Sequence, residues 1–421
     1  MNILVIGYVW PEPASSAAGY RMLALLDAFR RENWQVTFAS PAEKSTHRAN
    51  LPALGISEIN IALNCSSFDD FIRELQPDLV MFDRFMMEEQ FGWRVEMCCP
   101  DAVRILDTED LASLRYARQQ ACKRTGQVQV DVPLELLFSE HAKREIAAIL
   151  RSDLSLMISG AEIDRLRTDF NVDPALLLEL PFMRPPVTAE HKKRLPGFDE
   201  RQHFIVIGNF RHAPNWDAVL WLKQTIWPLI RKQLPQAELH IYGAYPPPKA
   251  TQLHNPREGF LVKGWADDVN DVMQKARVNL APLRFGAGLK GKLVDALACG
   301  TPSITTSIGA EGMNGADDWP QALADTPEQF ATHAVSLYCA ANQWARYQHQ
   351  GFELHNERFA IDRHEKTLIE RIKQLRENLE PHRLANFTGA MLRHHSMKST
   401  QYMAQWIEAK NRLLKDQDTH S

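Results

Sequence analysis

Residues 284–302 read RFGAGLKGKLVDALACGTP, a glycine-rich loop that leads into a short apolar helix pattern. Gly286, Gly288 and Gly291 match G-x-G-x-x-G, the dinucleotide-binding fingerprint, while Gly286, Gly291 and Lys292 match the opening of a P-loop. Both motifs hold phosphate at the amino end of a helix. The loop therefore predicts a phosphate site, and its neighbours must show which kind.

Neither complete motif fits the surrounding sequence. A dinucleotide fingerprint follows the first strand of its domain, whereas this loop follows the fourth strand pattern of the second half of the chain, although Glu311 does lie about 20 residues after Gly291. A P-loop needs Ser or Thr after its lysine to ligate magnesium, and Leu293 stands there. We therefore disfavour a dehydrogenase and an NTPase.

A diphosphate site without either motif explains the loop better. Glycines let the backbone approach an anion, Lys290 and Lys292 add positive charge, and the amides at the start of the helix point toward the same place. Asp295 lies one turn into that helix, where a carboxylate can accept hydrogen bonds from ribose hydroxyls. It could equally be a first-turn acid that complements the helix dipole.

Outside the loop, short continuous apolar runs alternate with amphipathic helix patterns. This arrangement is typical of parallel sheets covered on both faces. In the first half the runs are NILVIG, QVTFAS, DLVMFD, VRILD and LSLMIS. In the second half they are HFIVIGNF, ELHIYGAY, FLVKGW, VNLAPL and PSITTS.

The two series predict an α/β protein with two doubly wound, Rossmann-like domains that face a central cleft. We place the first domain at residues 1–184, a proline-rich and charged linker at 185–202, and the second domain at 203–364. Residues 365–421 form a charged helical extension, which we expect to pack on its own chain.

Composition limits the function further. The formal net charge of −4 gives no excess of positive charge for nucleic acid, so a small-molecule partner is expected. The six cysteines show no C-x-x-C pair, which fits a reducing cytoplasm and no zinc site. No run reaches the length of a membrane helix, so any membrane contact would be peripheral, at the cytosolic face. A basic cluster on residues 115–124 is interpreted as a solvated helix face.

The run GAGLKGKLVDALACGTPSITTSIGAEGM resembles the nucleotide-sugar segment of retaining glycosyltransferases with the GT-B fold, the family-four type also called glycosyl transferases group 1. Weaker likeness extends over most of the chain, from the first strand and its glycine-bearing loop to VIGNFRHAPNWDAVLWL. The resemblance implies that the second domain holds a nucleoside-diphosphate sugar, that the first holds the acceptor, and that neither metal nor cofactor is needed.

On the donor side, the resemblance places Asp295 where the family has its ribose-binding glutamate. It implies that Arg211 and Lys290 stabilise the diphosphate as catalytic groups. The other donor-binding positions that it implies are Gly19, Trp265, Gly286, Gly288, Leu289, Gly291, Lys292 and Glu311. Ala287 stands where many relatives have a glutamate near the sugar, so the donor sugar is left open.

On the acceptor side, LDTEDL replaces a segment in which many relatives carry a histidine. Asp107, Glu109 and Asp110 therefore become candidate ligands for acceptor hydroxyls or for a cationic group. Asp110 could instead cap the helix that follows it.

The implied reaction transfers a sugar to an acceptor hydroxyl with retention of anomeric configuration. The acceptor would be a glycan, a lipid-linked molecule or a small molecule. Two alternatives remain open: a non-catalytic nucleotide-sugar-binding or scaffolding protein of the same fold, and a sugar-nucleotide epimerase or phosphorylase.

Overall fold

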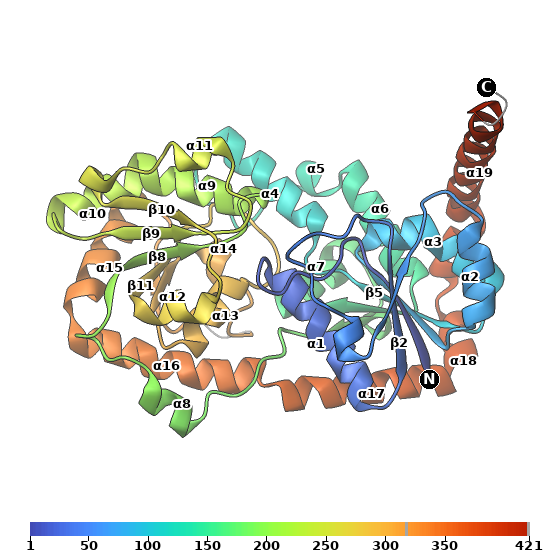
Figure 1. Ribbon diagram of the computed structural model, residues 1–421, viewed down its shortest axis with the longest axis horizontal. Helices are drawn as coiled ribbons and strands as arrows, with labels where there is room; N and C mark the ends of the chain where they lie inside the picture. The colour runs from blue at the N-terminus through green and yellow to red at the C-terminus, as the bar shows by residue number, and fades with distance from the viewer. Residues whose placement is uncertain (316–318, 419–421) are drawn as a thin grey trace.

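The computed structural model describes residues 1–315 and 319–418. It contains two separate parallel β-sheets, one of seven strands and one of six, with helices packed around each (Figure 1). The predicted α/β architecture of two doubly wound domains is confirmed.

The first sheet has the strand order β3-β2-β1-β4-β5-β6-β7, and every neighbouring pair is parallel. Its strands are β1 (Asn2–Ile6), β2 (Gln35–Ser40), β3 (Ser57–Asn60), β4 (Leu79–Asp83), β5 (Val103–Asp107), β6 (Leu154–Met157) and β7 (Leu177–Glu179). The chain reverses direction across the sheet between β1 and β4, which is where such folds bind ligands.

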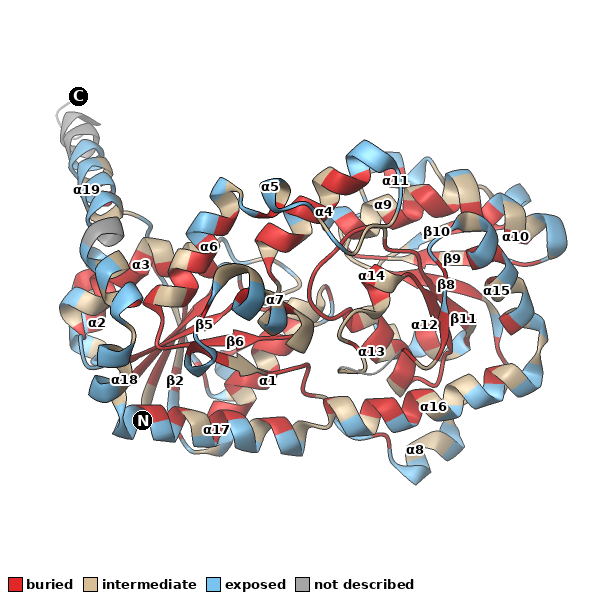
Figure 2. Cartoon of the chain, turned by 180° about the vertical axis from the view of Figure 1, so that it is seen from behind, coloured by how far each residue is buried: buried red, intermediate tan, exposed pale blue. Residues whose placement is uncertain are grey.

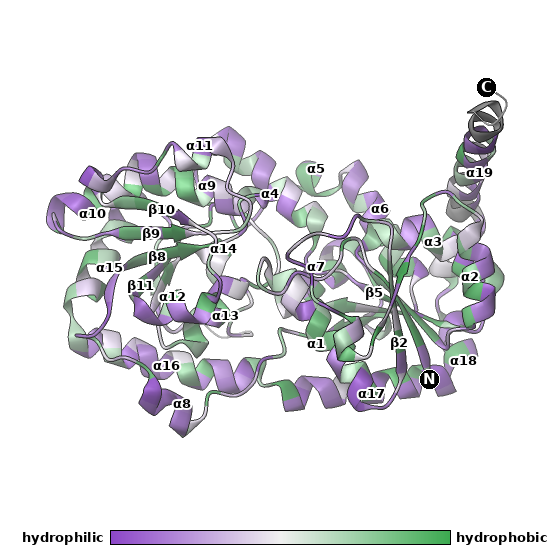
Figure 3. Cartoon of the chain, in the orientation of Figure 1, coloured by the Kyte–Doolittle hydropathy of each residue, from purple (hydrophilic) through white to green (hydrophobic). Residues whose placement is uncertain are grey.

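Strand β1 shows why the central strands are continuously apolar. Ile3 and Val5 pack into one hydrophobic core cluster, while Leu4 and Ile6 pack into another on the opposite face of the sheet. Because successive side chains of a strand point to opposite faces, a strand that is buried on both faces is apolar at nearly every position. Figure 2 shows these strands as buried, and Figure 3 shows them as hydrophobic between helices whose outer faces are hydrophilic.

The second sheet repeats the topology with the order β10-β9-β8-β11-β12-β13. Its strands are β8 (Gln202–Ile207), β9 (Leu239–Tyr242), β10 (Phe260–Gly264), β11 (Ala276–Ala281), β12 (Ser303–Thr305) and β13 (Ala322–Leu323). All ten apolar runs identified in the sequence contain a strand. The strands β3, β7 and β13 were not predicted, because they are two to four residues long and lie at or near sheet edges.

Helices fill the connections between strands. In the first domain they are α1 (Ala17–Arg31), α2 (Ser67–Leu75), α3 (Phe85–Cys98), α4 (Ala112–Thr125), α5 (Leu134–Leu137), α6 (Glu140–Arg151) and α7 (Gly160–Phe170). The linker contains α8 (Ala189–Arg194). In the second domain they are α9 (Ala213–Trp221), α10 (Trp227–Gln233), α11 (Pro248–Thr251), α12 (Val269–Lys275), α13 (Gly291–Ala298), α14 (Ser307–Ala310), α15 (Pro327–Cys339) and α16 (Ala341–Phe359).

The chain crosses between the domains twice, and the two crossings are hydrogen-bonded to each other. The amide of Arg184 donates to the carbonyl of Phe359 at 2.8 Å, and the amide of Ile361 donates to the carbonyl of Arg184 at 3.0 Å. Helix α17 (Ile361–Glu377) then returns to the first domain, where Leu368 and Ile372 join the core cluster that contains Ile3. The last helices therefore belong to the packing of the first domain.

The predicted helical extension continues as α18 (Leu379–Ala385) and α19 (Phe387–Asp418). Helix α19 packs against α3 and α6, and its far end projects from the body of the protein (Figure 1). Among the described residues, no helix is both long enough and apolar enough to cross a membrane.

Candidate functional site

The glycine-rich loop joins the end of β11 to the start of α13, at the carboxyl edge of the second sheet. Gly288 has φ +61°, and a Cβ there would lie 2.9 Å from the Asp110 Cβ. A Cβ on Gly291 would lie 2.4 Å from the Ala17 Cβ. Both neighbours belong to the first domain. These two glycines therefore let the domains approach each other.

Lys290 and Lys292 both lie at the amino end of α13. The Lys290 ammonium is buried and donates to the carbonyls of Ala287, at 3.1 Å, and Gly288. The Lys292 Nζ donates to Asn215 Oδ1 at 2.7 Å. Burial, together with the nearby charge of Lys290, lowers the pKa of Lys292 to about 7. Burial also lowers the pKa of Lys290, against the opposing effect of Glu311.

These shifts describe cationic groups that lack enough negative charge around them. An anion placed between the two ammonium groups would favour their charged forms and return their pKa values toward that of a solvated lysine. The amino end of α13 is therefore suited to a polyanionic ligand such as a diphosphate.

Asp295 lies one turn into α13, and its side chain is 23% exposed. Its Oδ1 is 2.8 Å from Arg184 Nη2, and the Arg184 guanidinium lies over the ring of Tyr20 at 3.5 Å from the centroid. Burial raises the pKa of Asp295, while Arg184 opposes that effect. Arg184, at the interdomain crossing, was not identified from the sequence.

Glu311 lies between the domains and is not a loop acid in solvent. Its two carboxylate oxygens accept hydrogen bonds from Arg118 Nη1 at 2.7 Å and Nη2 at 2.6 Å. Arg118 Nη1 also donates to the carbonyl of Gly286 at 3.0 Å. Burial alone would raise the pKa of Glu311, but Arg118 lowers it. One arginine of α4 thus holds both the glycine-rich loop and the loop after β12.

The interpretation of residues 115–124 as a solvated basic face is wrong for two of its arginines. Arg118 is fully buried, and Arg115 forms an ion pair with Asp110 at 2.7 Å. Helix α4 directs Arg118 toward the second domain and Arg115 toward the loop that contains Asp110. A count of charges along the sequence does not show these directions.

Glu162, in the first turn of α7, is a second bridge between the domains. Its Oε1 accepts hydrogen bonds from the amide of Gly288 at 2.9 Å and from the amide of Leu111 at 2.8 Å. Burial raises the pKa of this carboxyl, and Asp110 raises it further. A carboxylate oxygen of the first domain thus accepts a hydrogen bond from an amide of the glycine-rich loop.

The candidate acceptor residues follow β5. Asp107 is fully buried, and its carboxylate accepts hydrogen bonds from Arg21 Nε and Nη2 at distances down to 2.8 Å. Glu109 has φ 64° and is less buried; burial and the negative charge of Asp107 raise its pKa. Asp110 has its pKa lowered, because Arg115 outweighs the opposite effect of burial. Asp107 is thus an internal anchor, while Glu109 and Asp110 lie nearer the surface.

Asp110 does not cap α4, so that alternative is wrong. The helix begins at Ala112, and no side chain of the residue before it caps the helix. Glu145 takes this role from α6: its carboxylate accepts hydrogen bonds from the amides of Ala112 and Ser113, both at 2.9 Å. Asp110 instead lies against Gly288 of the glycine-rich loop.

Arg84 adds a cation to this acidic group. Its Nε is 3.6 Å from Asp83 Oδ1, and its guanidinium lies 5.2 Å from the centroid of the exposed Tyr8 ring. Burial alone would lower the pKa of Arg84, but the negative charges of Asp83 and Glu109 raise it. The carboxyl ends of β1, β4 and β5 therefore present a mixed-charge surface toward the second domain.

The remaining candidates lie on loops around the same interface. The Arg211 guanidinium lies over the Tyr245 ring at 3.7 Å, and the Tyr245 hydroxyl donates to the carboxylate of Glu12 at 2.9 and 3.0 Å. Trp265 stacks on His47, with ring centroids 4.2 Å apart. Both contacts join the second domain to the loops that follow β1 and β2.

Two candidates have structural roles in the packing. Gly19 lies in the first turn of α1, where a Cβ would come within 2.4 Å of the Glu12 carbonyl. Leu289 is buried in a core cluster that joins Ile158 and Phe182 of the first domain to Leu293 of α13. The two domains therefore meet through an apolar cluster as well as through ion pairs.

No group of three His, Cys, Asp or Glu side chains arranged to hold a metal ion is present in residues 1–315 and 319–418. The sequence-predicted positions that the structure brings together are the glycine-rich loop, Glu311, Glu109 and Asp110.

Comparison with known proteins identifies a family model that matches the second domain. Residues 201–339 match the family model "Glycosyl transferases group 1". No curated protein sequence matches the chain.

Several solved structures share the fold over nearly their whole length. Sucrose-phosphate synthase from Thermosynechococcus elongatus is 16% identical with a TM-score of 0.63, and the match covers 89% of this chain and 99% of that chain. HepE from Anabaena, solved with UDP-glucose, is 12% identical with a TM-score of 0.65, covering 89% and 100%. A glycosyltransferase from Rickettsia africae is 10% identical with a TM-score of 0.64, covering 90% and 99%.

These proteins have the GT-B architecture, with two Rossmann-like domains and C-terminal helices. The chain therefore has a GT-B fold, and residues 201–339 of its second domain match the glycosyl transferases group 1 model.

Proposed function

We propose that this protein transfers a sugar from a nucleoside-diphosphate sugar to an acceptor hydroxyl, with retention of anomeric configuration and without a metal ion. The observation that carries the proposal is the pair Lys290 and Lys292 at the amino end of α13, where burial lowers the pKa of both ammonium groups. The similarity of the second domain to the group 1 model, and of the fold to HepE, which was solved with UDP-glucose, supports a nucleotide-sugar donor.

In the proposed reaction, the residues on the donor side of the interdomain interface have distinct roles. Negative charge develops on the leaving diphosphate as the glycosidic bond breaks. Lys292, Lys290 and the amides at the start of α13 would stabilise this charge through fixed electrostatic interactions. Arg211 would reach the same diphosphate after leaving the Tyr245 ring. Asp295 would bind the ribose hydroxyls.

The acceptor would bind on the first domain, beside Glu109, Asp110 and Arg84. Glu109 has its pKa raised by burial and by Asp107, which places it closer to neutral pH than a solvated carboxyl. Such a group can accept a hydrogen bond, or a proton, from an acceptor hydroxyl. We propose a glycan, a lipid-linked molecule or a small molecule as the acceptor; a lipid-linked one would bring the protein to the cytosolic face of a membrane.

Domain movement is part of the proposal. The bond from Gly288 to Glu162 and the pair Arg118–Glu311 lie where donor and acceptor would meet. Substrates would therefore bind to a more open arrangement, and closure would assemble the site and exclude water.

The experiment that tests the proposal is a calorimetric titration of the full chain with UDP, GDP, dTDP and NAD, each with and without EDTA. We expect one nucleoside diphosphate to bind with an affinity that EDTA does not change. Binding of NAD alone would show that Gly286, Gly288 and Gly291 form a dinucleotide site instead.

The sugar donor of the base that binds is then incubated with the protein, and the products are followed by NMR. Release of nucleoside diphosphate with formation of a glycoside of unchanged anomeric configuration is expected. A binding protein would release none, and an epimerase would change the sugar without an acceptor.

A further inference from the structure

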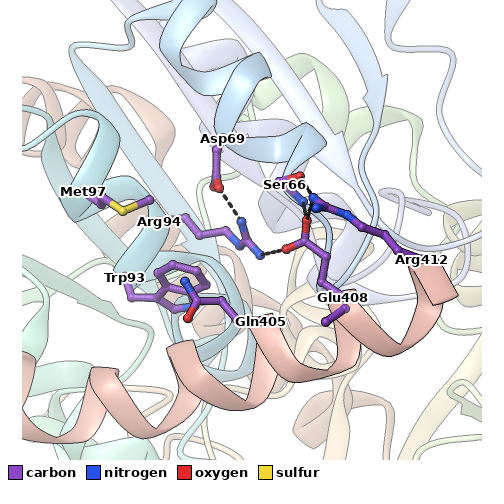
Figure 4. A pocket seen from close by; sticks show the side chains of 9 residues that line it. Ser66, Asp69, Trp93, Arg94, Met97, Gln405, Glu408 and Arg412 are labelled. Carbon is purple, nitrogen blue, oxygen red and sulfur yellow. Dashed lines mark hydrogen bonds and ion pairs between the residues drawn. The ribbon is translucent and has the colours of Figure 1, made fainter.

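A polar pocket lies outside the interdomain site, between α2, α3 and the C-terminal helix α19 (Figure 4). Its volume is about 290 Å³, near the lower end of the roughly 300–1,000 Å³ of small-molecule sites. The helices that form it are at the end of the first domain remote from α13 (Figure 1).

The pocket is lined by buried polar atoms that have no hydrogen-bond partner among the described residues. Arg94 is 2% exposed; its Nη1 donates to Asp69 Oδ2 at 2.6 Å, but its Nη2 makes no hydrogen bond within the described chain and has only a long ion pair with Glu408. Asp69 Oδ1 and Trp93 Nε1 likewise make no hydrogen bond within the described chain. A buried polar atom without a hydrogen-bond partner lowers the stability of the folded state. Three of them along one pocket indicate a site for a polar ligand.

Helix α19 supplies the opposite wall with a fixed carboxylate. Glu408 Oε1 accepts hydrogen bonds from the amide of Ser66 at 3.1 Å and from Arg412 Nη2 at 2.6 Å. Glu408 Oε2 then lies 3.7 Å from Arg94 Nη2, beyond hydrogen-bond distance (Figure 4). The guanidinium and this carboxylate therefore form a long ion pair without a hydrogen bond between them.

The arrangement of donors and acceptors selects the ligand. Two carboxylates, Asp69 and Glu408, balance two guanidinium groups, Arg94 and Arg412, so the pocket has no net charge to attract a free anion or cation. A hydroxyl group suits this long ion pair, since it can accept from Arg94 Nη2 while it donates to Asp69 Oδ1 or Glu408 Oε2. The side chain of Met97, 50% exposed at the rim, offers apolar surface to C–H groups.

We propose that this pocket binds a neutral saccharide unit. Neighbouring hydroxyls of a sugar ring would form hydrogen bonds with Arg94 Nη2, Asp69 Oδ1 and Trp93 Nε1. The apolar face of the ring would contact Met97. The inference does not rest on the proposed glycosyl transfer, because none of these residues lies at the interdomain site.

The test is saturation-transfer NMR and calorimetry on the full chain. The probes are the methyl glycosides of glucose, galactose, mannose and N-acetylglucosamine, with inorganic phosphate and tetramethylammonium as ionic probes. We expect at least one glycoside to bind and neither ion to compete with it. A short oligosaccharide of that sugar identifies the source: tighter binding indicates a longer glycan, and equal binding indicates a free sugar.

Two variants locate the binding. Ala409→Phe fills the pocket from α19 and should weaken glycoside binding by about tenfold or more, whereas Asn411→Phe, on the same helix outside the pocket, should leave it unchanged. Arg94→Lys retains a cation for Asp69 but removes the second terminal nitrogen, Nη2, and should also weaken binding by about tenfold. Circular dichroism and the thermal unfolding midpoint report that each variant is folded.

The proposal is overturned if none of the glycosides binds, or if Ala409→Phe binds a glycoside as tightly as the natural chain. The second result would place the sugar elsewhere, for instance at the acceptor surface. Binding of either ion in competition with the glycoside would assign the pocket to a charged ligand.

Discussion

Arg118 of the first domain binds Glu311 of the second domain with both terminal guanidinium nitrogens, at 2.7 and 2.6 Å from the two carboxylate oxygens. The same guanidinium holds the carbonyl of Gly286. Because Arg118 is fully buried, it has no alternative contact with solvent while the domains touch. The position of the glycine-rich loop is thus coupled to the position of the first domain.

A double-mutant cycle on this pair measures that coupling. Arg118→Met alone or Glu311→Gln alone leaves a partner without its ion pair, and we expect each to lower the free energy of unfolding by about 3 kcal/mol. The double variant should lose less than the sum of the two. Urea unfolding of the four proteins gives the values. Additive losses would mean that the two side chains do not interact in solution.

The lowered pKa of Lys292 predicts that the protein takes up protons when it binds the nucleoside diphosphate. Its pKa is about 7 in the free protein, so at about pH 8 the side chain is mostly neutral, and a bound diphosphate would restore its charge. Calorimetry in buffers of different ionisation enthalpy should detect uptake of up to about one proton at that pH. Lys292→Met should reduce this uptake to the part contributed by Lys290, whose pKa is also lowered. Identical heats in all buffers, after correction for the ligand, would contradict the assignment.

The same side chain has a predictable effect on stability. The folded pKa of Lys292 lies below its ordinary value of 10.5, so the unfolded chain binds more protons between those two pKa values, and stability rises with pH across that interval. Lys292→Met should therefore raise Tm most at neutral or lower pH and little above the ordinary lysine pKa. Scanning calorimetry across this pH range tests the sign of the change in Tm. If the fold stabilised the ammonium group, Lys292→Met would lower Tm at neutral or lower pH instead of raising it.

Lys290 is predicted to act on turnover more than on folding. Its ammonium is buried in the glycine-rich loop and would contribute to stabilising the leaving diphosphate. Lys290→Ala should lower kcat by about a hundredfold to a thousandfold. Lys275→Ala, an exposed lysine of α12, is the control and should have no effect. Turnover by Lys290→Ala within a few-fold of the natural rate would remove this residue from the mechanism.

The sequence predicted the fold well because its evidence is local. Continuous apolar runs such as NILVI predict strands that are buried on both faces. The glycines of the 284–302 stretch lie between such a run and an apolar helix pattern, so they predict a loop that joins a strand to a helix. Strands such as β3, with the sequence SEIN, carry no such signal, because they are held by pairing with β2 and are only partly buried.

The candidate site was harder to predict because its partners come from distant parts of the chain. Glu162 reaches Gly288 across 126 positions, and Arg118 reaches Glu311 across 193. Neither residue belongs to a motif, and Arg118 resembled one more solvated arginine of a basic helix. These pairs form only because the edges of the two sheets face each other in the folded protein. The spacing of residues along the sequence does not contain that information.

Asp295 allows two explanations that a pair of ligands can separate. If its carboxylate binds the ribose, Asp295→Asn should weaken binding of the nucleoside diphosphate by about tenfold, and should weaken its 2′-deoxy analogue much less. If Asp295 only complements the dipole of α13 or holds Arg184, both ligands should lose affinity equally. Asp271→Asn is the matched control, because Asp271 is an exposed first-turn acid of α12. Calorimetric titration of the three proteins with both ligands decides between the explanations, and an equal loss for the two ligands would remove Asp295 from the ribose site.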